Sequence, residues 1–370
     1  MDKKIKVIYL ILILTLNFSC VEKNSMNNDI YSSELITTLN KDKDTLKFNS
    51  GIRAILQDSK GNYWFGSLQE GVAVYNGKSF NYFTINEGLT DNQIHSIQED
   101  KQGVIWFNTQ TGVSSYDGER ITNHTKGDLE NSQNSLPVQG VEPLHSAWMK
   151  FDNDLWFEAG NKSGVYRFDG QQLHYLDLPP QKVLNPHDNL FAVTDISEGK
   201  NNMIWFATYA GVFGYDGNDF TIINDETLGY DRKTQALHIR SIFEDSKGRL
   251  WIGNNGIGVL LKEGNSIINF SNKHRLIYHN SKGNAEKSAK GTLEHVFIIA
   301  EDNKGNIWFG DRDAGIWRYD GNQFKNYAKN DGLKNDFALS IYEDRNSELW
   351  FGMANGSIYK FNSKTFEKKF

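Results

Sequence analysis

Seven tryptophans recur within one short phrase, and this repeat constrains the fold of the 370-residue chain more than any other feature. Successive members are 42 to 57 residues apart. A period of this length, with strand-like and turn-rich units, is typical of β-propeller blades. The seven are Trp64, Trp106, Trp156, Trp205, Trp251, Trp308 and Trp350. We therefore expect an all-β fold, a seven-bladed β-propeller of four-stranded antiparallel blades over residues 50–370.

The sixth copy shows how one blade would be built. Its apolar segments are rich in β-branched and aromatic residues, which favours strands. We expect strands over 295–301, 306–310, 315–319 and 323–327. Asp302-Asn-Lys-Gly305 and Asp320-Gly321 are turn signals between them. We interpret the repeated Asp, Gly and Trp residues as turn and packing residues, and not as a binding site.

The N-terminal segment differs from the repeats. A basic stretch at residues 2–6 precedes an apolar run at 7–16, which is too short to span a bilayer. Cys20, the single cysteine of the chain, follows this run. We predict a lipoprotein-type signal peptide over 1–19 with Cys20 as the lipidated residue. Because Asn17 replaces the usual aliphatic residue of such signals, an ordinary secretory signal is the alternative.

Residues 20–49 are mostly polar, and we interpret them as a tether. Residues 43–48 are a possible strand that closes the ring by pairing with the last blade. A lone cysteine excludes an intrachain disulfide, so ring closure and packing must supply the stability. The formal charge of −6 gives no basic patch of the kind that binds nucleic acid, and we expect no nucleic-acid partner.

Two repeated phrases carry a family resemblance. They are Glu301-Asp-Asn-Lys-Gly-Asn-Ile-Trp308-Phe-Gly and Gly315-Ile-Trp-Arg-Tyr-Asp-Gly321, and the blade openings Asn86-Glu-Gly-Leu89 and Asn330-Asp-Gly-Leu333 add to them. Over residues 50–361 the chain resembles the two-component regulator propeller repeat. The resemblance implies a periplasmic sensory propeller, many of which respond to polysaccharide fragments. The chain contains no kinase or DNA-binding region, so the resemblance does not extend to a signalling output.

Loop length separates the two faces of the predicted propeller. The loops between second and third strands, and those from an outer strand to the next inner strand, vary in length and emerge on the same face. Functional residues concentrate on variable loops held by a rigid scaffold. We expect the ligand on this variable-loop face. Its longest loops are 126–146, 177–189, 224–237 and 271–294.

The position eleven residues before each core tryptophan lies near the start of an inner strand. It holds Arg53, His95, His145 and Arg240 in blades one, two, three and five. Such a ring would suit carboxylates, sulfates or sugar hydroxyls, since Arg binds anions through two parallel hydrogen bonds. The alternative is that they are ordinary polar residues at strand edges. His238, His295, Tyr209 and Arg312 are further candidates on the same face.

No catalytic or cofactor motif stands out. The sequence has no His-Glu-x-x-His pair, nucleophile elbow or phosphate-binding glycine loop. We expect no cofactor and no metal. The leading hypothesis is an exported, lipid-anchored, non-enzymatic sensory propeller in the cell envelope that binds an oligosaccharide or an envelope protein, with membrane contact through its lipid alone. The alternatives are a protein–protein scaffold of the envelope and a propeller lyase or hydrolase.

Overall fold

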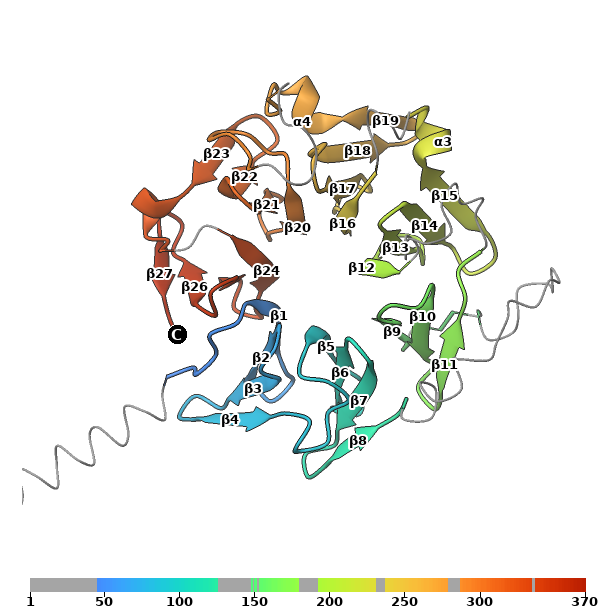
Figure 1. Ribbon diagram of the computed structural model, residues 1–370, viewed down its shortest axis with the longest axis vertical. Coiled ribbons are helices and arrows are strands. Elements are labelled where there is room, and N and C mark those ends of the chain that lie inside the picture. Colours follow the sequence, from blue (N-terminus) through green and yellow to red (C-terminus); the bar gives the residue numbers. More distant parts are fainter. Residues whose placement is uncertain are drawn as a thin grey trace, which may run out of the picture. The chain divides into compact units, whose positions relative to one another are not determined.

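A computed structural model describes residues 45–125, 148, 150–151, 153–179, 192–230, 237–278, 287–334 and 337–370. Within Thr45–Phe370 they form seven antiparallel sheets arranged in a ring (Figure 1). This is the seven-bladed propeller expected from the sequence. Six sheets have four strands, and the third has three among the described residues. The signal peptide and Cys20 lie outside the described residues.

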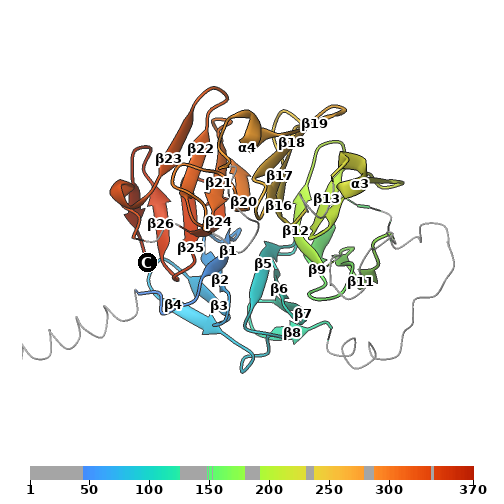
Figure 2. The same ribbon diagram turned by 45° about the horizontal axis from the view of Figure 1, so that its top comes forward.

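Each blade is a meander whose first strand faces the centre of the ring and whose last strand lies outermost (Figures 1 and 2). Blade one consists of β1 (Ile52–Gln57), β2 (Tyr63–Ser67), β3 (Val72–Tyr75) and β4 (Phe80–Phe83). Blade two consists of β5 (Ile94–Glu99), β6 (Ile105–Thr109), β7 (Gly112–Tyr116) and β8 (Ile121–Asn123). Blade three contains β9 (Leu155–Glu158), β10 (Val165–Phe168) and β11 (Leu173–Leu176).

The remaining blades repeat the same order. Blade four consists of β12 (Val193–Glu198), β13 (Ile204–Thr208), β14 (Gly211–Tyr215) and β15 (Phe220–Asn224). Blade five consists of β16 (Ile239–Glu244), β17 (Leu250–Asn254), β18 (Val259–Glu263) and β19 (Ser266–Asn269). Blade six consists of β20 (Val296–Glu301), β21 (Ile307–Asp311), β22 (Gly315–Tyr319) and β23 (Phe324–Tyr327). Blade seven consists of β24 (Ala338–Glu343), β25 (Leu349–Met353), β26 (Ile358–Phe361) and β27 (Phe366–Lys368).

Single helical turns occur in the connections that follow blades four, five and six. They are α3 (Asp225–Leu228), α4 (Phe270–Lys273) and η2 (Lys329–Asp331). α3 begins after Asn224, whose side chain accepts a hydrogen bond from Thr227 N, and ends at Gly229 in the left-handed conformation. The predicted strands of blade six agree with β20 to β23 within one residue at each end.

In five blades the repeated aspartate holds the repeated tryptophan of its own blade, whereas Trp205 of blade four donates to Glu244 of blade five. In blade six, Asp302 accepts hydrogen bonds from the indole Nε1 of Trp308 at 2.8 Å and from the turn amides of Lys304 and Asn306. Equivalent indole contacts of 2.8–2.9 Å occur in blades one, two, five and seven. All seven tryptophans are at most 6% exposed. The structural interpretation of the repeated Asp and Trp residues is confirmed.

The repeated glutamate joins neighbouring blades. Glu301 at the end of β20 accepts from the backbone amide of Ser246 in the blade-five turn at 2.6 Å. Glu343 accepts from Asn303 N of blade six at 2.7 Å, so the same link recurs one blade further on. The Glu-Asp pair therefore connects two blades and fixes one turn. This dual role explains why both residues recur in the repeat.

The ring closes through packing between blades seven and one. The possible strand at 43–48 is not formed in its described part, since residues 45–48 have no strand structure. Blade seven takes its outermost strand, β27, from the C-terminal residues. Leu46 and Phe48 are nevertheless buried in the cluster that spans this seam. Ser340 Oγ donates to Ile52 O at 2.9 Å across it.

Candidate functional site

A β-bulge in each described inner strand turns one side chain toward the centre of the ring. In blade one the register between β1 and β2 shifts between Ile52 and Ala54, and the other five described inner strands shift at the same place. The extra residues are Arg53, His95, Thr194, Arg240, Phe297 and Leu339. Bulges re-aim side chains in this way, often next to functional sites.

These six residues are the ones that lie eleven positions before a core tryptophan, and all six line one cavity of about 260 Å³. The structure therefore brings Arg53, His95 and Arg240 together, as in the ring interpretation and not in the alternative of separate strand-edge residues. His145, the blade-three member of the predicted ring, lies outside the described residues. The cavity has an apolar side, formed by Phe297, Ile298 and Leu339 of blades six and seven.

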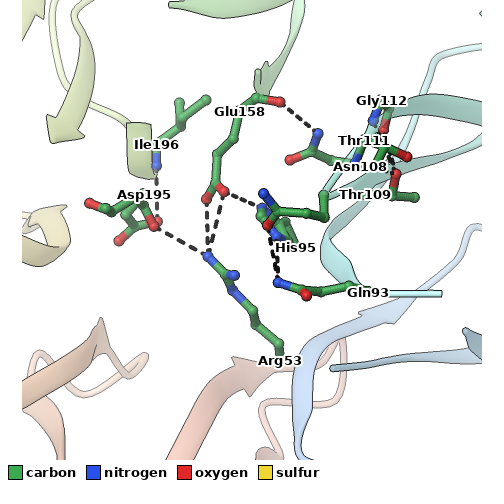
Figure 3. Close-up of polar contacts among 12 residues, drawn as sticks. Arg53, Gln93, His95, Asn108, Thr109, Thr111, Gly112, Glu158, Asp195 and Ile196 are labelled. Atoms are coloured by element: carbon green, nitrogen blue, oxygen red, sulfur yellow. Dashed lines mark hydrogen bonds and ion pairs between the residues drawn. The ribbon is translucent and has the colours of Figure 1, made fainter. Parts of the chain in front are cut away.

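Glu158 of blade three is the acceptor at the ionic side of the cavity (Figure 3). Its Oε1 lies 3.4 Å from Arg53 Nη2, and its Oε2 is hydrogen-bonded to His95 Nδ1. Because a carboxylate only accepts, His95 Nδ1 carries a proton, while His95 Nε2 lies 3.3 Å from the side-chain amide of Gln93. Burial acts to raise the pKa of Glu158, but Arg53, His95 and Arg240 hold it below its ordinary value.

Asp195 lies beside Glu158, on β12, and links two blades. Its Oδ2 accepts from the backbone amide of Ile242 in β16 at 2.9 Å. Enclosure by the surrounding blades raises the pKa of Asp195 to about 7, and the charge of Glu158 adds to this effect. Asp195 is also one of the residues that line the cavity.

Arg240 faces the same cavity without a carboxylate. Among the described residues no Asp or Glu oxygen lies within 4 Å of its guanidinium, and its buried Nε has no acceptor. Nη1 donates to Tyr209 Oη at 3.1 Å. The guanidinium carbon lies 5.1 Å from the ring centre of Tyr209 and 4.8 Å from that of Phe297. Burial, with Arg53 and Arg312 nearby, lowers the pKa of Arg240.

The further candidates lie near Arg240. Tyr209 contacts it directly, and His238 and Arg312 act on it or are acted on by it electrostatically. The ring of His238 packs edge-on against Tyr209, and burial together with Arg240 lowers the pKa of His238 to about 4. Arg312 pairs with Asp313 at 2.7 Å. His295 is fully buried and hydrogen-bonded through Nδ1 to Asn255, so it does not lie at an exposed rim.

Glu158 and Asp195 were missed by the sequence reasoning, although both depart from the repeat. Glu158 stands two residues after Trp156, where blades one, five, six and seven have glycine. In blade six a Cβ on that glycine, Gly310, would lie 2.9 Å from Ala338 O of the next inner strand. Asp195 stands where blades two, five and seven have serine. Comparing the copies for charged outliers would have found both.

No group of three or more His, Cys, Asp or Glu residues suited to a metal occurs in the part of the chain that the structure describes. Over the same residues, no helix has the length and apolarity needed to cross a membrane.

Comparison with known proteins agrees with this geometry. The model of the two component regulator propeller matches residues 45–69, 88–111 and 235–256. Within these three segments the chain carries the two component regulator propeller repeat. Its matched segments include the inner strands β1, β5 and β16, which supply Arg53, His95 and Arg240 to the cavity. No curated protein matches the chain.

Several solved structures share the fold of the chain. The extracellular domain of the putative hybrid two component system BT3049 from B. thetaiotaomicron has 20% identity and a TM-score of 0.54 over 86% of the chain. The chain spans 40% of that domain. Virginiamycin B lyase from Staphylococcus aureus has 16% identity and a TM-score of 0.56, with 85% of this chain and 95% of the lyase covered.

A third relative is PorZ, a bacterial surface component of the type-IX secretion system of Porphyromonas gingivalis. It has 16% identity and a TM-score of 0.54, with 86% of this chain and 48% of PorZ covered. Identities this low show the fold alone. Sensor, enzyme and secretion proteins share the fold, so function must be argued from the cavity.

Proposed function

We propose that the chain is an exported, lipid-anchored, non-enzymatic sensory propeller that binds a small polar ligand, a glycan fragment, on its variable-loop face. The observation that carries this proposal is the convergence of Arg53, His95, Glu158 and Arg240 on one cavity. A concave site with a few convergent polar groups is the usual form of a small-molecule site. Similarity to the extracellular domain of a two component system supports an exported location.

The size of the cavity favours the end of a chain or a single small molecule. At about 260 Å³ it is just below the range of roughly 300–1,000 Å³ that is usual for drug-sized ligands. A terminal sugar fits this scale better than a long oligosaccharide lying along the site. Longer chains would continue over the variable loops.

The scaffold alternative receives less support from the described surface. The scaffold alternative predicts an exposed, contiguous apolar patch on the loop face. The large apolar side chains exposed among the described residues are Ile85, Phe151, Tyr175 and Tyr278, and they are dispersed over blades one, three and five. An envelope protein remains the partner to seek if sugars fail to bind.

A binding screen tests the proposal. The full chain, solubilised in detergent, is applied to an oligosaccharide array beside an Arg53→Ala/Arg240→Ala variant. A surface control, Arg120→Ala/Arg345→Ala, removes the same charge at side chains that are 81% and 53% exposed. We expect a sugar that binds the parent and the control but not the cavity variant. Absence of any sugar binding would contradict the proposal.

One observation favours an enzyme as the second candidate. His95 contacts Glu158, and Asp195 has a pKa of about 7 in the same cavity, which is the arrangement expected of an acid–base pair. Virginiamycin B lyase shows that a similar fold hosts catalysis. Mass spectrometry of a bound sugar over hours tests this candidate. A new product that His95→Ala abolishes would replace the sensory proposal with the enzymatic one.

A further inference from the structure

Arg240 differs from the two arginines near it, Arg53 and Arg312, in its ion pairing. Arg53 has Glu158 at 3.4 Å and Arg312 has Asp313 at 2.7 Å, so each of these cations already has a carboxylate. Arg240 has none within 4 Å among the described residues, and only its Nη1 has a described acceptor, the Tyr209 hydroxyl. Keeping a charge out of water without a counter-ion is costly. A ligand anion would supply the missing acceptor.

The plane of the guanidinium is fixed before any ligand arrives. Tyr209 and Phe297 lie 5.1 and 4.8 Å from its central carbon, and Tyr209 Oη also holds Nη1. Of the remaining donors, Nε is buried, and Nη2 has no described acceptor. A carboxylate oxygen accepts a strong, charge-assisted hydrogen bond from such an N–H group. Because the guanidinium is already immobilised, little side-chain entropy is lost on binding.

The residues around Arg240 indicate what the anion is attached to. Phe297, Ile298 and Leu339 make one side of the cavity apolar, while Glu158 and Asp195 on the opposite side are hydrogen-bond acceptors. A ligand that fits has a carboxylate, one apolar face and hydroxyl donors. A uronic acid at the end of a sugar chain has all three features. A simple cyclic carboxylic acid shares the first two.

We propose that the cavity is a carboxylate subsite, in which Arg240 binds the acid group of a uronate-terminated saccharide whose ring lies against Phe297. This inference rests on the proposed glycan-binding function and specifies its ligand class. In this arrangement Arg53, His95 and Glu158 form the wall that contacts the sugar hydroxyls. Arg240 is then the residue that determines specificity for acidic over neutral sugars.

Isothermal titration of the full chain with three probes tests the subsite. They are digalacturonate, its methyl ester, which keeps the sugar and lacks the charge, and cyclohexanecarboxylate, which keeps the charge and lacks the hydroxyls. We expect digalacturonate to bind at least tenfold more tightly than the other two. We expect Arg240→Gln to lower its affinity at least tenfold, Arg240→Lys to recover part of it, and Arg120→Gln to have no effect.

Thermal unfolding separates binding from structure. If Arg240 is held for a ligand, Arg240→Gln removes a cation that has no described carboxylate within 4 Å, and the unliganded protein keeps or gains stability. A clear loss of stability in that variant, with digalacturonate affinity unchanged, would assign Arg240 to packing and overturn the proposal.

The remaining outcomes are also decisive. Equal binding of digalacturonate and its ester overturns the carboxylate subsite and leaves the glycan-binding proposal intact. If cyclohexanecarboxylate binds as tightly as digalacturonate, the carboxylate subsite stands, but its ligand is a simple carboxylic acid and not a uronate. Binding of neutral sugars alone overturns the subsite, whereas no binding of any sugar or acid overturns both proposals.

Discussion

Arg53 of blade one and Glu158 of blade three approach to 3.4 Å across the centre of the ring, although they are 105 residues apart in the sequence. Arg53 is the bulge residue of β1. Glu158 lies on β9, at the position where blades one, five, six and seven have glycine. Arg53 thus has a carboxylate within 4 Å, whereas Arg240 has none among the described residues and acts on Glu158 only from a greater distance. The ionic character of the cavity follows from this pair.

Removing the charge of Glu158 is expected to destabilise the ring. Glu158→Gln leaves Arg53 without its carboxylate, and breaking a buried pair costs about 3 kcal/mol at pH 7. The folded-state pKa of Glu158 is lowered, so its stabilisation is present above the ordinary value near 4.5 and is lost as pH falls. Urea denaturation at pH 7 and pH 4 measures the difference between parent and variant. The prediction would be contradicted if the difference in unfolding free energy between parent and variant did not become smaller at pH 4. It would also be contradicted if the exposed control Glu119→Gln lost as much stability.

Asp195 should make stability fall as pH rises. Its pKa is about 7 in the folded state against 3.8 ordinarily, so between these values the folded chain binds a proton that the unfolded chain has lost. The unfolding free energy then decreases by at most about 1.4 kcal/mol per pH unit from this group. Asp195→Asn keeps an acceptor for Ile242 N and removes the titration. The stability of the variant relative to the parent should increase from pH 4 to pH 7; a constant difference would refute the raised pKa.

The two turn aspartates of blade six should differ sharply in importance. Asp302→Ala leaves the buried indole of Trp308 and two turn amides without an acceptor, which costs about 2–3 kcal/mol. Asp320→Ala removes two contacts at an exposed hairpin and serves as the matched control, with a much smaller loss expected. Thermal and urea unfolding compare them. Equal losses would show that the Asp–Trp contact does not stabilise the blade.

Gly352 should be essential to the seam that closes the ring. A Cβ at this position would lie 2.3 Å from Ser340 Oγ and 2.6 Å from Ile52 O, so Gly352→Ala forces blades seven and one apart. We expect a loss of about 1–3 kcal/mol in unfolding free energy. Blade four already has alanine at the equivalent place, so Ala207→Gly is the control and should lose about 1 kcal/mol through glycine's backbone freedom. An unchanged Gly352→Ala protein would contradict the close approach.

Lipid anchoring gives a cellular prediction. Cys20→Ala removes the single thiol that could be lipidated and should move the protein from membranes to the soluble fraction. Fractionation followed by detection with an antibody measures this. Cys20→Ser is a second variant that keeps the size of the side chain. Membrane association that persists in both variants would exclude the anchor.

The architecture could be predicted because the same strand and turn signals recur in seven copies, one for each blade. The tryptophan spacing, the turn glycines and the Asp-Gly hairpins are local signals, and they predicted seven blades and the strands of blade six. The alignment of Arg53, His95 and Arg240 eleven residues before a tryptophan also gave a shared ring as one of two interpretations, the other being separate polar residues at strand edges. The β-bulge explains why this position, and not its neighbours, faces the centre.

The partners within the cavity could not be predicted from any single copy. Glu158 reaches Arg53 and His95 through the closure of the ring, which brings blades one, two and three to one centre. The burial of His295 likewise depends on Asn255 of the preceding blade. The sequence left open whether residues 43–48 or the C-terminal strand would complete blade seven, because both segments resemble strands. The structure shows that β27 already occupies the outer edge of blade seven.

The most direct test of the ligand site is a crystal structure of the chain with a saccharide selected on the array. The predicted result is density for the sugar in the central cavity, with an acidic group within hydrogen-bond distance of Arg240 and hydroxyls beside Glu158. Density for the sugar on the outer strands or on the opposite face, with the cavity holding only water, would contradict the site.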